Sequence, residues 1–356
     1  MIKKMSKTTG SNLITYGMVL VLYLIMQGLL AGGKVNNLIN GLLIPVCVYV
    51  VMAVSLNLTV GILGELSLGH AGFMCVGAFV SGVFSLAAEA ALPNVMIRFP
   101  LAIILGAAGA AVMGMIVGIP TLRLRGDYLA IVTLAFGEII KNIVNAIYLG
   151  RDEHGLHLSL GGMKELNMSE AGTVLIKGPQ GMTLGNTLRN STFTVGIVLV
   201  LAALFIVLNL KNSRTGRAIM AIRDNRIAAE SVGINISKYK LMAFTISAAL
   251  AGAAGAVYSH SLASVAAKKF DYNLSIMILV YVVLGGIGNI RGSIIAATVL
   301  YLLPEMLRGL QDYRMLIYAI VLILVMLFNW SPSLIDLRKR YSPGRLLQNR
   351  RKKEGL

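Results

Sequence analysis

The chain has 356 residues, of which 56% are hydrophobic and only 13% are charged. Soluble domains carry about a quarter charged residues, so this composition excludes an ordinary soluble enzyme or binding domain and predicts a polytopic membrane protein. The net charge of +17 would also suit a nucleic acid partner, but we interpret it as Lys and Arg collecting in cytoplasmic loops, and we expect no nucleic acid binding.

Ten apolar segments follow one another along the chain, each long enough to cross a hydrocarbon core of about 30 Å. The first follows a basic start that resembles a signal peptide. Its apolar run is long and further spans follow, so we interpret it as an uncleaved span. The predicted fold class is an all-α membrane protein, a polytopic bundle of about ten transmembrane helices with glycine-rich discontinuous segments. We place the spans at 13–31, 38–57, 66–87, 100–118, 128–149, 192–210, 241–259, 272–287, 292–308 and 314–330.

The basic residues predict the orientation of the bundle. Ten crossings place both termini on one side, and with that side cytoplasmic, the cytoplasmic segments hold 21 of the 32 Lys and Arg residues. This bias follows the positive-inside rule and favours an N-in/C-in topology. The predicted parts are a cytoplasmic N-terminus (1–12), a transmembrane domain (13–330) with a cytoplasmic turn at 58–65, an external loop at 150–190 and a cytoplasmic loop at 211–240, and a basic cytoplasmic tail (331–356).

A glycine-rich stretch interrupts the apolar sequence before the third predicted span. It reads SLNLTVGILGELSLGHAGFMCVGAFVSG (55–82), and its candidate pathway residues are Gly64, Glu65, Ser67, Gly69 and His70. Non-helical backbone at membrane depth is tolerated only where protein or water satisfies its polar groups. We therefore predict a discontinuous segment that faces the bundle interior. The alternative is that Glu65 lies in the cytoplasmic turn and His70 is a packed residue.

A second glycine cluster, GGIGNIRG at 285–292, joins two later spans. It resembles a phosphate-binding loop only superficially, because no strand precedes it. We assign Gly285, Gly286 and Gly288 to the same candidate pathway. Ionisable residues within spans are costly and usually face a protein interior or a wet cavity. Further residues of this kind are Glu138, Lys141, Arg291 and Glu305.

Signatures of enzymatic chemistry are absent from the sequence. It holds neither G-x-x-x-x-G-K-[ST] nor H-E-x-x-H, and its two cysteines, Cys47 and Cys75, lie in apolar segments, which favours neither a disulfide framework nor a zinc site. A membrane enzyme using Ser67 and His70 stays open as an alternative, although Glu65 stands where a nucleophile elbow has its first glycine. We expect no catalytic residue, metal or cofactor on this chain.

The cytoplasmic loop KNSRTGRAIMAIRDNRIAAESVGINISKYK (211–240) has the pattern of a short amphipathic helix. Such a helix suits docking into a groove of another protein, and the alternative is a surface helix at the lipid headgroups. Wound as a helix from Gly216 and stopped at Gly233, the loop places Ala218, Ala221, Ile222, Ala228, Ala229 and Val232 on one side, and Arg223, Arg226 and Glu230 on the other.

This loop resembles the coupling loop of ABC-importer permeases, whose broad signature is E-A-A-x-x-x-G. Ala228, Ala229 and Gly233 match it, while Ile227 replaces the glutamate. The stretches LNLTVGILGELSLGHAGFMCVGAF, TLRLRGDYLAIVTLAFGEI and GGIGNIRGSIIAATVLYLLPEMLR are similar to the branched-chain amino acid permeases. The combination of S-L-G-H-A with R-L-R-G-x-Y-L-A-x-x-T-L resembles the LivM type, and the resemblance runs from about Leu56 to Arg308.

The resemblance implies the membrane-spanning permease subunit of an ATP-driven importer for leucine, isoleucine or valine in a bacterial cytoplasmic membrane. It implies three kinds of protein partner besides membrane lipid: a homologous LivH-type permease, two cytoplasmic ATPases that would hold ATP and Mg²⁺, and an extracytoplasmic binding protein. The loop at 150–190 is our candidate contact for the binding protein. The implied ATPase-coupling residues are Gly216, Arg217, Arg223, Ala228, Ala229 and Gly233.

Two alternatives to this interpretation stay open. Related permeases with similar motifs carry urea, short amides or other amino acids, so these residues leave the cargo undecided. A self-powered secondary transporter, driven by protons through Glu65, His70 or Glu138, would share the same composition. That second alternative gives the loop at 211–240 no role.

Overall fold

The structure is a computed structural model that describes residues 7–32, 36–89, 91–124, 126–152, 155–166, 168, 172–185 and 190–330. The chain divides into two compact units, residues 1–298 and residues 299–356. The predicted basic tail at 331–356 and the first six residues of the predicted N-terminal segment lie outside the described residues.

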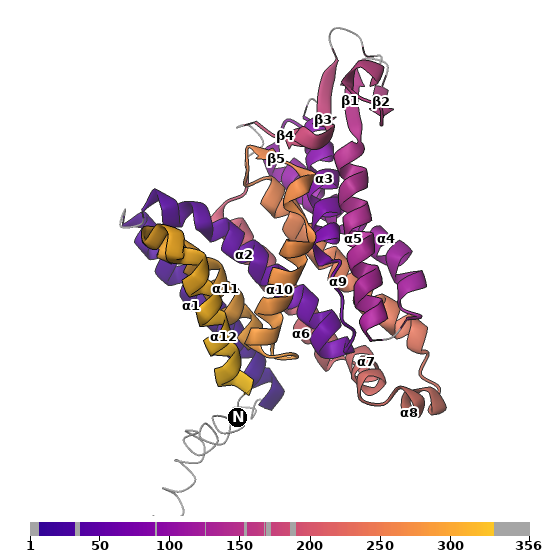
Figure 1. The fold of residues 1–356 in the computed structure, drawn as a ribbon, viewed down its shortest axis with the longest axis vertical. Coiled ribbons are helices and arrows are strands. Elements are labelled where there is room, and N and C mark those ends of the chain that lie inside the picture. Colours follow the sequence, from indigo (N-terminus) through magenta and orange to yellow (C-terminus); the bar gives the residue numbers. More distant parts are fainter. Residues whose placement is uncertain are drawn as a thin grey trace, which may run out of the picture. The chain divides into compact units, whose positions relative to one another are not determined.

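Each of the ten predicted spans coincides with a helix. The first unit contains α1 (Lys7–Ala31), α2 (Asn37–Asn57), α3 (His70–Ala87), α4 (Val95–Thr121), α5 (Asp127–Ala146), α6 (Phe193–Asn212), α9 (Ile236–Ser259), α10 (Tyr272–Gly285) and the first half of α11 (Ile290–Met306) (Figure 1). The second unit contains the rest of α11, a 3₁₀ segment (Leu307–Tyr313) and α12 (Arg314–Trp330).

Eight helices in the described residues are long and apolar enough to cross a membrane. α10 is not one of them, because it has only 14 residues. At 1.5 Å per residue it extends about 21 Å, which is less than a hydrocarbon core of about 30 Å. The chain that enters α10 from β5 (Ser264–Val265) must therefore reach into the membrane before the helix begins. A polytopic all-α membrane protein with discontinuous segments is the result.

The packed centre of the first unit is formed by α3, α4 and α9. Small residues recur along α4, and Gly106, Ala110 and Gly114 are buried. A Cβ atom on Gly114 would lie 2.6 Å from the Cβ of Ala248 on α9, so the two backbones approach as closely as small residues allow. Without a hydrophobic driving force between helices in lipid, such close packing is a main source of association.

The end of the second span differs from the prediction. The turn expected at 58–65 is helical up to Leu63, because α2 continues as a π-helical segment, η1 (Leu58–Leu63). All six residues of η1 are buried, and the helix ends only at Gly64, whose φ of +81° is unfavourable for other residues. The cytoplasmic turn predicted at 58–65 is thus wrong, and the non-helical backbone spans 64–69.

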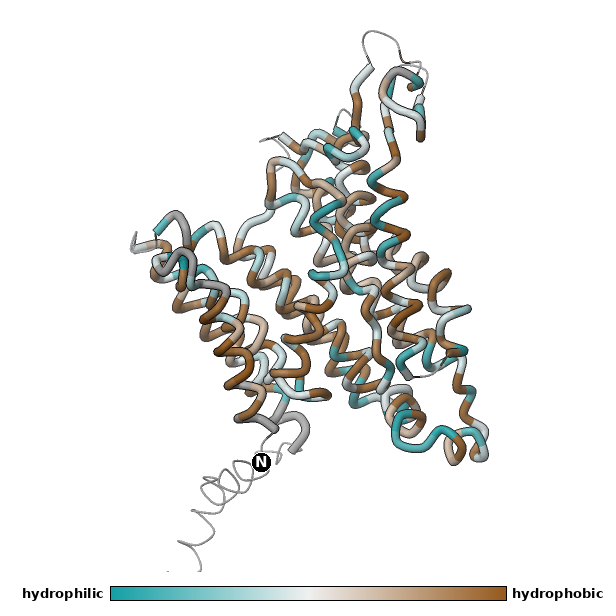
Figure 2. The backbone as a smooth tube through the Cα atoms, viewed as in Figure 1, coloured by the Kyte–Doolittle hydropathy of each residue, from teal (hydrophilic) through white to brown (hydrophobic). Residues whose placement is uncertain are grey.

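The loop at 150–190, which is predicted to be external, contains β structure. β1 (Tyr148–Asp152) pairs antiparallel with both β2 (Gly155–Ser159) and β3 (Thr173–Lys177), in the order β2–β1–β3. β4 (Met182–Thr183) pairs with β5, the strand that precedes α10. Figure 1 shows these strands at one end of the first unit and the short helices α7 (Arg214–Asp224) and α8 (Arg226–Ser231) at the other. Figure 2 shows hydrophilic backbone gathered around α7 and α8, with apolar helices between the two ends.

Candidate functional site

The predicted coupling loop folds as two short helices rather than one. Asn225 leaves the helical region with φ −155° and ψ 105°, and its side-chain oxygen accepts a hydrogen bond from the Ala228 amide at 3.1 Å. This capping side chain ends α7 and begins α8, so the continuous helix predicted from Gly216 to Gly233 is wrong. The predicted stop is confirmed, because Gly233, the second residue after α8, adopts φ +83°.

The two faces of the coupling loop also differ from the prediction. Ile222 and Ala229 are buried together with Ile236 in a small apolar cluster. Ala228 is exposed, and Val232 is 75% exposed. Ile227, which replaces the signature glutamate, is 81% exposed. The break at Asn225 turns α8, so its exposed tip carries apolar side chains that a partner protein can cover.

The start of α7 is fixed tightly against the end of α6. Gly216 is buried, and a Cβ atom there would clash with the carbonyl oxygens of Leu210 and Lys211. Arg217 donates a hydrogen bond from Nη1 to the Asn212 carbonyl at 3.1 Å. The start of α7 is therefore fixed to the last turn of α6.

α7 also rests on the π-helical end of the second span. Nη1 of Arg223 donates to the carbonyl oxygen of Gly61 at 2.9 Å. The stem of the same side chain covers Gly64, where an added Cβ would lie 2.5 Å from Cγ of Arg223. α7 therefore touches the point where the discontinuous segment begins.

The discontinuous segment at 64–69 is held by an ion pair at its start. Oε1 of Glu65 accepts from Nζ of Lys240 on α9, and the two side chains are 14% and 5% exposed. A buried charge needs a partner and good geometry to persist. Glu65 thus braces the segment against α9 and does not lie in a free cytoplasmic turn.

The far end of the segment packs between α5 and α10. The Leu68 amide donates to Oγ1 of Thr133 at 3.1 Å, and the Ala71 amide donates to Oγ of Ser275 at 3.0 Å. A Cβ atom on Gly69 would clash with the Thr133 carbonyl oxygen. Side chains from neighbouring helices satisfy the freed backbone groups, as the membrane environment requires.

The two glycine-rich breaks meet at Asn57, a residue that the sequence analysis missed. Its Oδ1 accepts from the Gly288 amide at 2.9 Å, and its Nδ2 donates to Oγ of Ser293 at 2.7 Å. Gly288 lies against Gly61, and a Cβ atom on Gly285 would lie 2.5 Å from the backbone of Gly292. Gly286 and Gly288 both have positive φ, at +94° and +79°. In the sequence, Asn57 was visible only as an amide side chain at the end of a long apolar run.

Ser67 and His70 do not form a catalytic pair in this arrangement. Nε2 of His70 lies 2.9 Å from Oγ of Ser55. Oγ of Ser67 and Nδ1 of His70 are buried and have no hydrogen-bond partner among the described residues. His70 is therefore packed, and one of its ring nitrogens has a hydrogen-bond partner on α2. This agrees with the alternative interpretation of that residue. The geometry gives no support to a serine nucleophile activated by this histidine.

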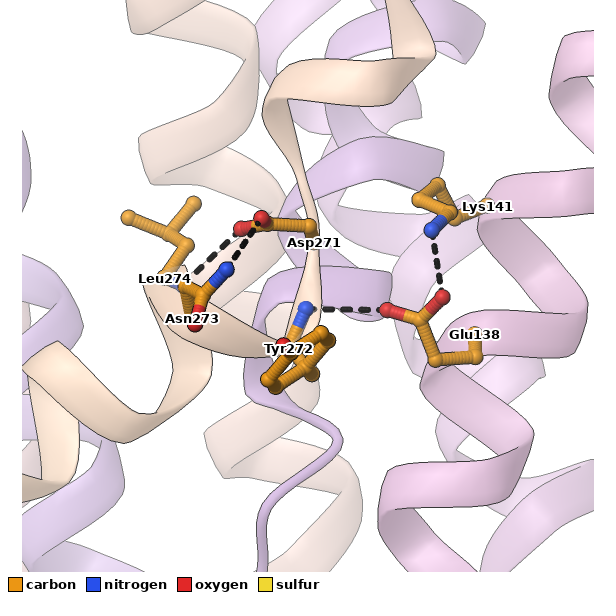
Figure 3. A network of polar contacts seen from close by, with 6 residues as sticks. All are labelled: Glu138, Lys141, Asp271, Tyr272, Asn273 and Leu274. Atoms are coloured by element: carbon orange, nitrogen blue, oxygen red, sulfur yellow. Dashed lines mark hydrogen bonds and ion pairs between the residues drawn. The ribbon is translucent and has the colours of Figure 1, made fainter.

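A polar network lies where α10 begins beside α5. Glu138 accepts from Nζ of Lys141 through one oxygen and from the Tyr272 amide through the other, the latter at 2.9 Å (Figure 3). Asp271 caps α10 by accepting from the Leu274 amide at 3.1 Å, and Nδ2 of Asn273 donates to its other oxygen at 2.9 Å. Asp271 and Asn273 are additions to the residues that the sequence singled out. They are visible in the sequence only as an ordinary helix cap.

The position of this network along α5 indicates what its exposed side faces. Glu138 is the twelfth residue of α5, so it lies about 17 Å along the helix from Asp127. The side chains of Glu138 and Lys141 are 25% and 16% exposed, and Tyr272 is 47% exposed. Charged groups at this depth rarely face lipid and usually face protein or a wet cavity. This side of α5 and α10 is thus suited to a pathway or to another membrane subunit.

The sheet formed by β1, β2 and β3 carries exposed apolar side chains. Leu156 and Leu158 lie on β2, an edge strand, and are 63% and 64% exposed, and Leu160 directly after it is 66% exposed. Exposed apolar residues that cluster on a soluble part mark an interaction site. No group of three or more His, Cys, Asp or Glu side chains in the described part of the chain is placed to hold a metal ion.

Comparisons with known proteins identify relatives. A family model described as the branched-chain amino acid transport system permease component matches residues 38–326. The chain is 34% identical over 293 residues to the high-affinity branched-chain amino acid transport system permease protein LivM of Escherichia coli K12, covering 80% of this chain and 67% of that protein. No solved structure matches the chain significantly.

Two more distant relatives cover similar shares of the sequence. The probable branched-chain amino acid transport permease protein LivM of Methanocaldococcus jannaschii is 24% identical over 307 residues, covering 78% of this chain and 83% of that protein. The ribose import permease protein RbsC of Escherichia coli K12 is 27% identical over 305 residues, covering 83% and 86%. These relatives thus share a transport role, while the cargoes in their names differ.

Proposed function

Because this chain belongs to the family of branched-chain amino acid transport system permease components, we propose that it is the membrane-spanning subunit of an ATP-driven importer for leucine, isoleucine and valine. Its partners in this proposal are a homologous LivH-type permease, two cytoplasmic ATPases and an extracytoplasmic binding protein. ATP and Mg²⁺ bind to the ATPases. The assembly lies in a bacterial cytoplasmic membrane.

The observation that carries the proposal is the contact between α7 and the membrane bundle. Arg223 joins the cytoplasmic helix to the carbonyl of Gly61, and the exposed Ile227 and Val232 leave an apolar tip beyond it. In this proposal an ATPase binds this tip and, when it changes conformation, displaces α7. Because α7 contacts η1, the displacement reaches η1 and the segment at 64–69. A proton-driven carrier has no use for such a connection. The contact supports a mechanical role for α7, the helix that carries several of the coupling residues implied by the resemblance.

The polar network on α5 and α10 favours a cargo that carries charged groups. A free amino acid carries an ammonium and a carboxylate, and both need compensation when they leave water. Glu138 and Lys141 offer one charge of each sign on a partly exposed face at membrane depth. Ribose carries no charge and has no need of such a pair. We therefore favour an amino acid over a sugar for this chain, and we place the pathway along the segment at 64–70 and this face.

The external sheet is the proposed contact for the binding protein. The leucines exposed on and after β2, namely Leu156, Leu158 and Leu160, form an apolar surface at the end of the first unit opposite α7 and α8 (Figure 1). A binding protein that covers this surface would release its amino acid close to the outer ends of α5 and α10.

Capture of an ATPase tests the coupling role directly. Membranes with this chain and co-expressed ATPases are solubilised, this chain is pulled down, and the bound ATPase is measured. We expect capture by the native chain and its loss in Ile227→Asp and Val232→Asp. The control is Ser237→Asp, which adds a carboxylate to an exposed cytoplasmic residue and should retain the ATPase. Equal capture by all four chains would contradict the docking role of the tip.

Uptake by vesicles that contain this chain, the homologous permease and both ATPases, supplied with the binding protein, tests the cargo and the energy source. We expect ATP-dependent uptake of radiolabelled leucine, competition by isoleucine and valine, and no competition by ribose or urea. Uptake by this chain alone that collapses with the proton gradient would refute the proposal in favour of a secondary transporter.

A further inference from the structure

One side chain, Asn57, holds the loop that joins α10 to α11 at two points. This loop spans residues 286–289. Oδ1 of Asn57 accepts from the Gly288 amide at 2.9 Å, and its Nδ2 donates to Oγ of Ser293 at 2.7 Å. The Ser293 hydroxyl in turn donates to the Asn289 carbonyl at 3.3 Å. Asn57 therefore fixes the loop once directly and once through the first turn of α11.

The amide of Asn57 does more than fill space between two helices. Asn57 and Ser293 are both fully buried. A buried amide needs hydrogen-bond partners, whereas an apolar side chain of similar shape, such as leucine, needs none. Apolar packing alone could therefore hold α2 against α11. The amide adds direction, because its two hydrogen bonds fix where the loop and the start of α11 lie relative to α2.

The same loop is connected to α7 along two routes. On the first, Arg223 of α7 donates to the Gly61 carbonyl, and a Cβ atom on Gly288 would lie 3.4 Å from that oxygen. On the second, Nζ of Lys211 donates to the Gly288 carbonyl at 3.4 Å. Lys211 lies in the last turn of α6, directly before α7. Both routes meet at Gly288, the residue whose amide Asn57 binds.

From these contacts we propose that Asn57 is a positioning residue for transport, which makes the 286–289 loop move together with η1 when α7 is displaced. The inference rests on the proposed function, in which an ATPase displaces α7. Arg223 moves η1 at Gly61. Asn57, one turn earlier on the same helix, carries that movement to the loop and, through Ser293, to α11. Both glycine-rich breaks then rearrange in one step. Without Asn57, the first of the two breaks alone follows α7.

Vesicles that contain this chain, the homologous permease and both ATPases, supplied with the binding protein, test the transport role. We expect Asn57→Leu to lower the maximal rate of leucine uptake by about tenfold, the scale of one lost hydrogen bond. The rate of ATP hydrolysis and the concentration of loaded binding protein that gives half-maximal uptake should stay unchanged. The control is Ser85→Ala, which removes a buried hydrogen bond to His260 near the other end of α3. A loss of stability alone lowers uptake and hydrolysis together, so this control should keep the native ratio of leucine carried to ATP hydrolysed.

Hydrogen exchange on the purified full-length chain tests the contact itself. In Asn57→Leu the Gly288 amide loses its acceptor, so it should exchange about tenfold faster than in the native chain, the scale of one lost hydrogen bond. Ser85→Ala should keep the native rate at this amide.

Two results would overturn the proposal. They are native exchange of the Gly288 amide in Asn57→Leu, and a native ratio of leucine carried to ATP hydrolysed in that variant. If Asn57→Leu does not fold, Ser293→Ala, which removes only the partner of Nδ2, must still lower this ratio. The exchange measurement needs no cargo and no partner. A native exchange rate therefore contradicts the role of Asn57, whereas absent leucine uptake by the native assembly contradicts the proposed function.

Discussion

Nη1 of Arg223 on helix α7 donates to the backbone carbonyl of Gly61 at 2.9 Å, across 162 residues of sequence. The carbonyl belongs to the π-helical end of the second span, one turn before the chain becomes non-helical at Gly64. A single side chain thus connects the loop predicted to be cytoplasmic with the part of the chain that breaks within the bundle. Side chains with two discrete arrangements are suited to carrying such coupling.

Replacing Arg223 should separate ATPase binding from transport. In Arg223→Ala the connection to Gly61 is lost, while the exposed tip at Ile227 and Val232 is unchanged. We expect ATPase capture at the native level and leucine uptake reduced by about tenfold or more, since removing a charged hydrogen bond costs about 1.5–3 kcal/mol. The measurement is pull-down and vesicle uptake on the same preparation.

The matched control for this variant is Arg214→Ala. Arg214 lies on the same helix, is exposed and is not one of the implied coupling residues. It should lower uptake far less than Arg223→Ala. If both variants transport like the native chain, Arg223 is a surface residue without a coupling role.

The ion pair between Glu65 and Lys240 should behave as a buried pair. Both side chains are largely removed from solvent, so Glu65→Lys or Lys240→Glu alone leaves two like charges together and should cost about 3–5 kcal/mol of stability. The exchanged double variant restores opposite charges and should recover most of that loss. Thermal unfolding in detergent measures all four chains. Additive losses in the double variant would show that the two side chains do not interact.

Gly61 should tolerate no side chain. A Cβ atom there would clash with Oδ1 of Asn57 and the amide of Gly288, so Gly61→Ala should separate the two glycine-rich breaks and cost about 1–3 kcal/mol. The control is Gly41→Ala in α2, where nothing lies within 4 Å. That change should stabilise by up to about 1 kcal/mol, because alanine favours a helix interior. The two variants are compared by thermal unfolding, and equal effects would argue against a tight contact at Gly61.

The spans were predictable because a bilayer imposes one dominant rule. About twenty apolar residues in succession have few alternatives to a helix. Every predicted span does contain a helix. The small-residue stripe on α4 was predictable for a similar reason, since glycine and alanine at four-residue spacing must share a face. The π-helical extension to Leu63 was not, because glycine and threonine in LTVGIL favour a turn locally and only burial on all sides overrides that preference.

The candidate site was predictable in its parts and not in its connections. Glycines at 61–69 and 285–288 identified two breaks, but their meeting at Asn57 depends on how spans far apart in sequence pack. The helical wheel for 211–240 placed Val232 on the same side as Ile222 and Ala229, because it assumed one continuous helix. A capping asparagine at position 225 changes the phase, and capping competes with helix continuation through a side-chain hydrogen bond of modest strength.

The exposed leucines of the external sheet should matter for delivery of the cargo and for nothing else. Leu156→Ser/Leu158→Ser removes the apolar surface of the edge strand without touching α7 or α8. We expect uptake to need a several-fold higher concentration of loaded binding protein, with ATPase capture unchanged. The control is Thr173→Ser on the opposite strand β3, which is exposed but polar. Unchanged dependence on the binding protein would remove the proposed contact from this loop.

Acidification should destabilise the external end of the bundle through His260. This residue follows α9 and lies 2.7 Å from Oγ of Ser85 through Nε2 and 2.8 Å from the Ala256 carbonyl through Nδ1. Burial lowers the pKa of His260 from 6.5, a backbone hydrogen bond to Ala256 opposes that shift, and the charge of Arg98 adds to it. The folded chain therefore keeps the ring neutral at a pH where the unfolded chain already binds a proton.

The direction of the pH effect follows from that difference. Stability is complete above about pH 6.5 and falls as the pH decreases below it, because the unfolded state then holds more protons. We expect the Tm in detergent to decrease from pH 7.5 to pH 5, and the decrease to be smaller in His260→Asn, which removes the titrating ring and keeps a donor near Ala256. Ser85→Ala keeps the ring and should keep the native pH dependence. If His260→Asn and the native chain lose the same Tm on acidification, other groups account for the effect.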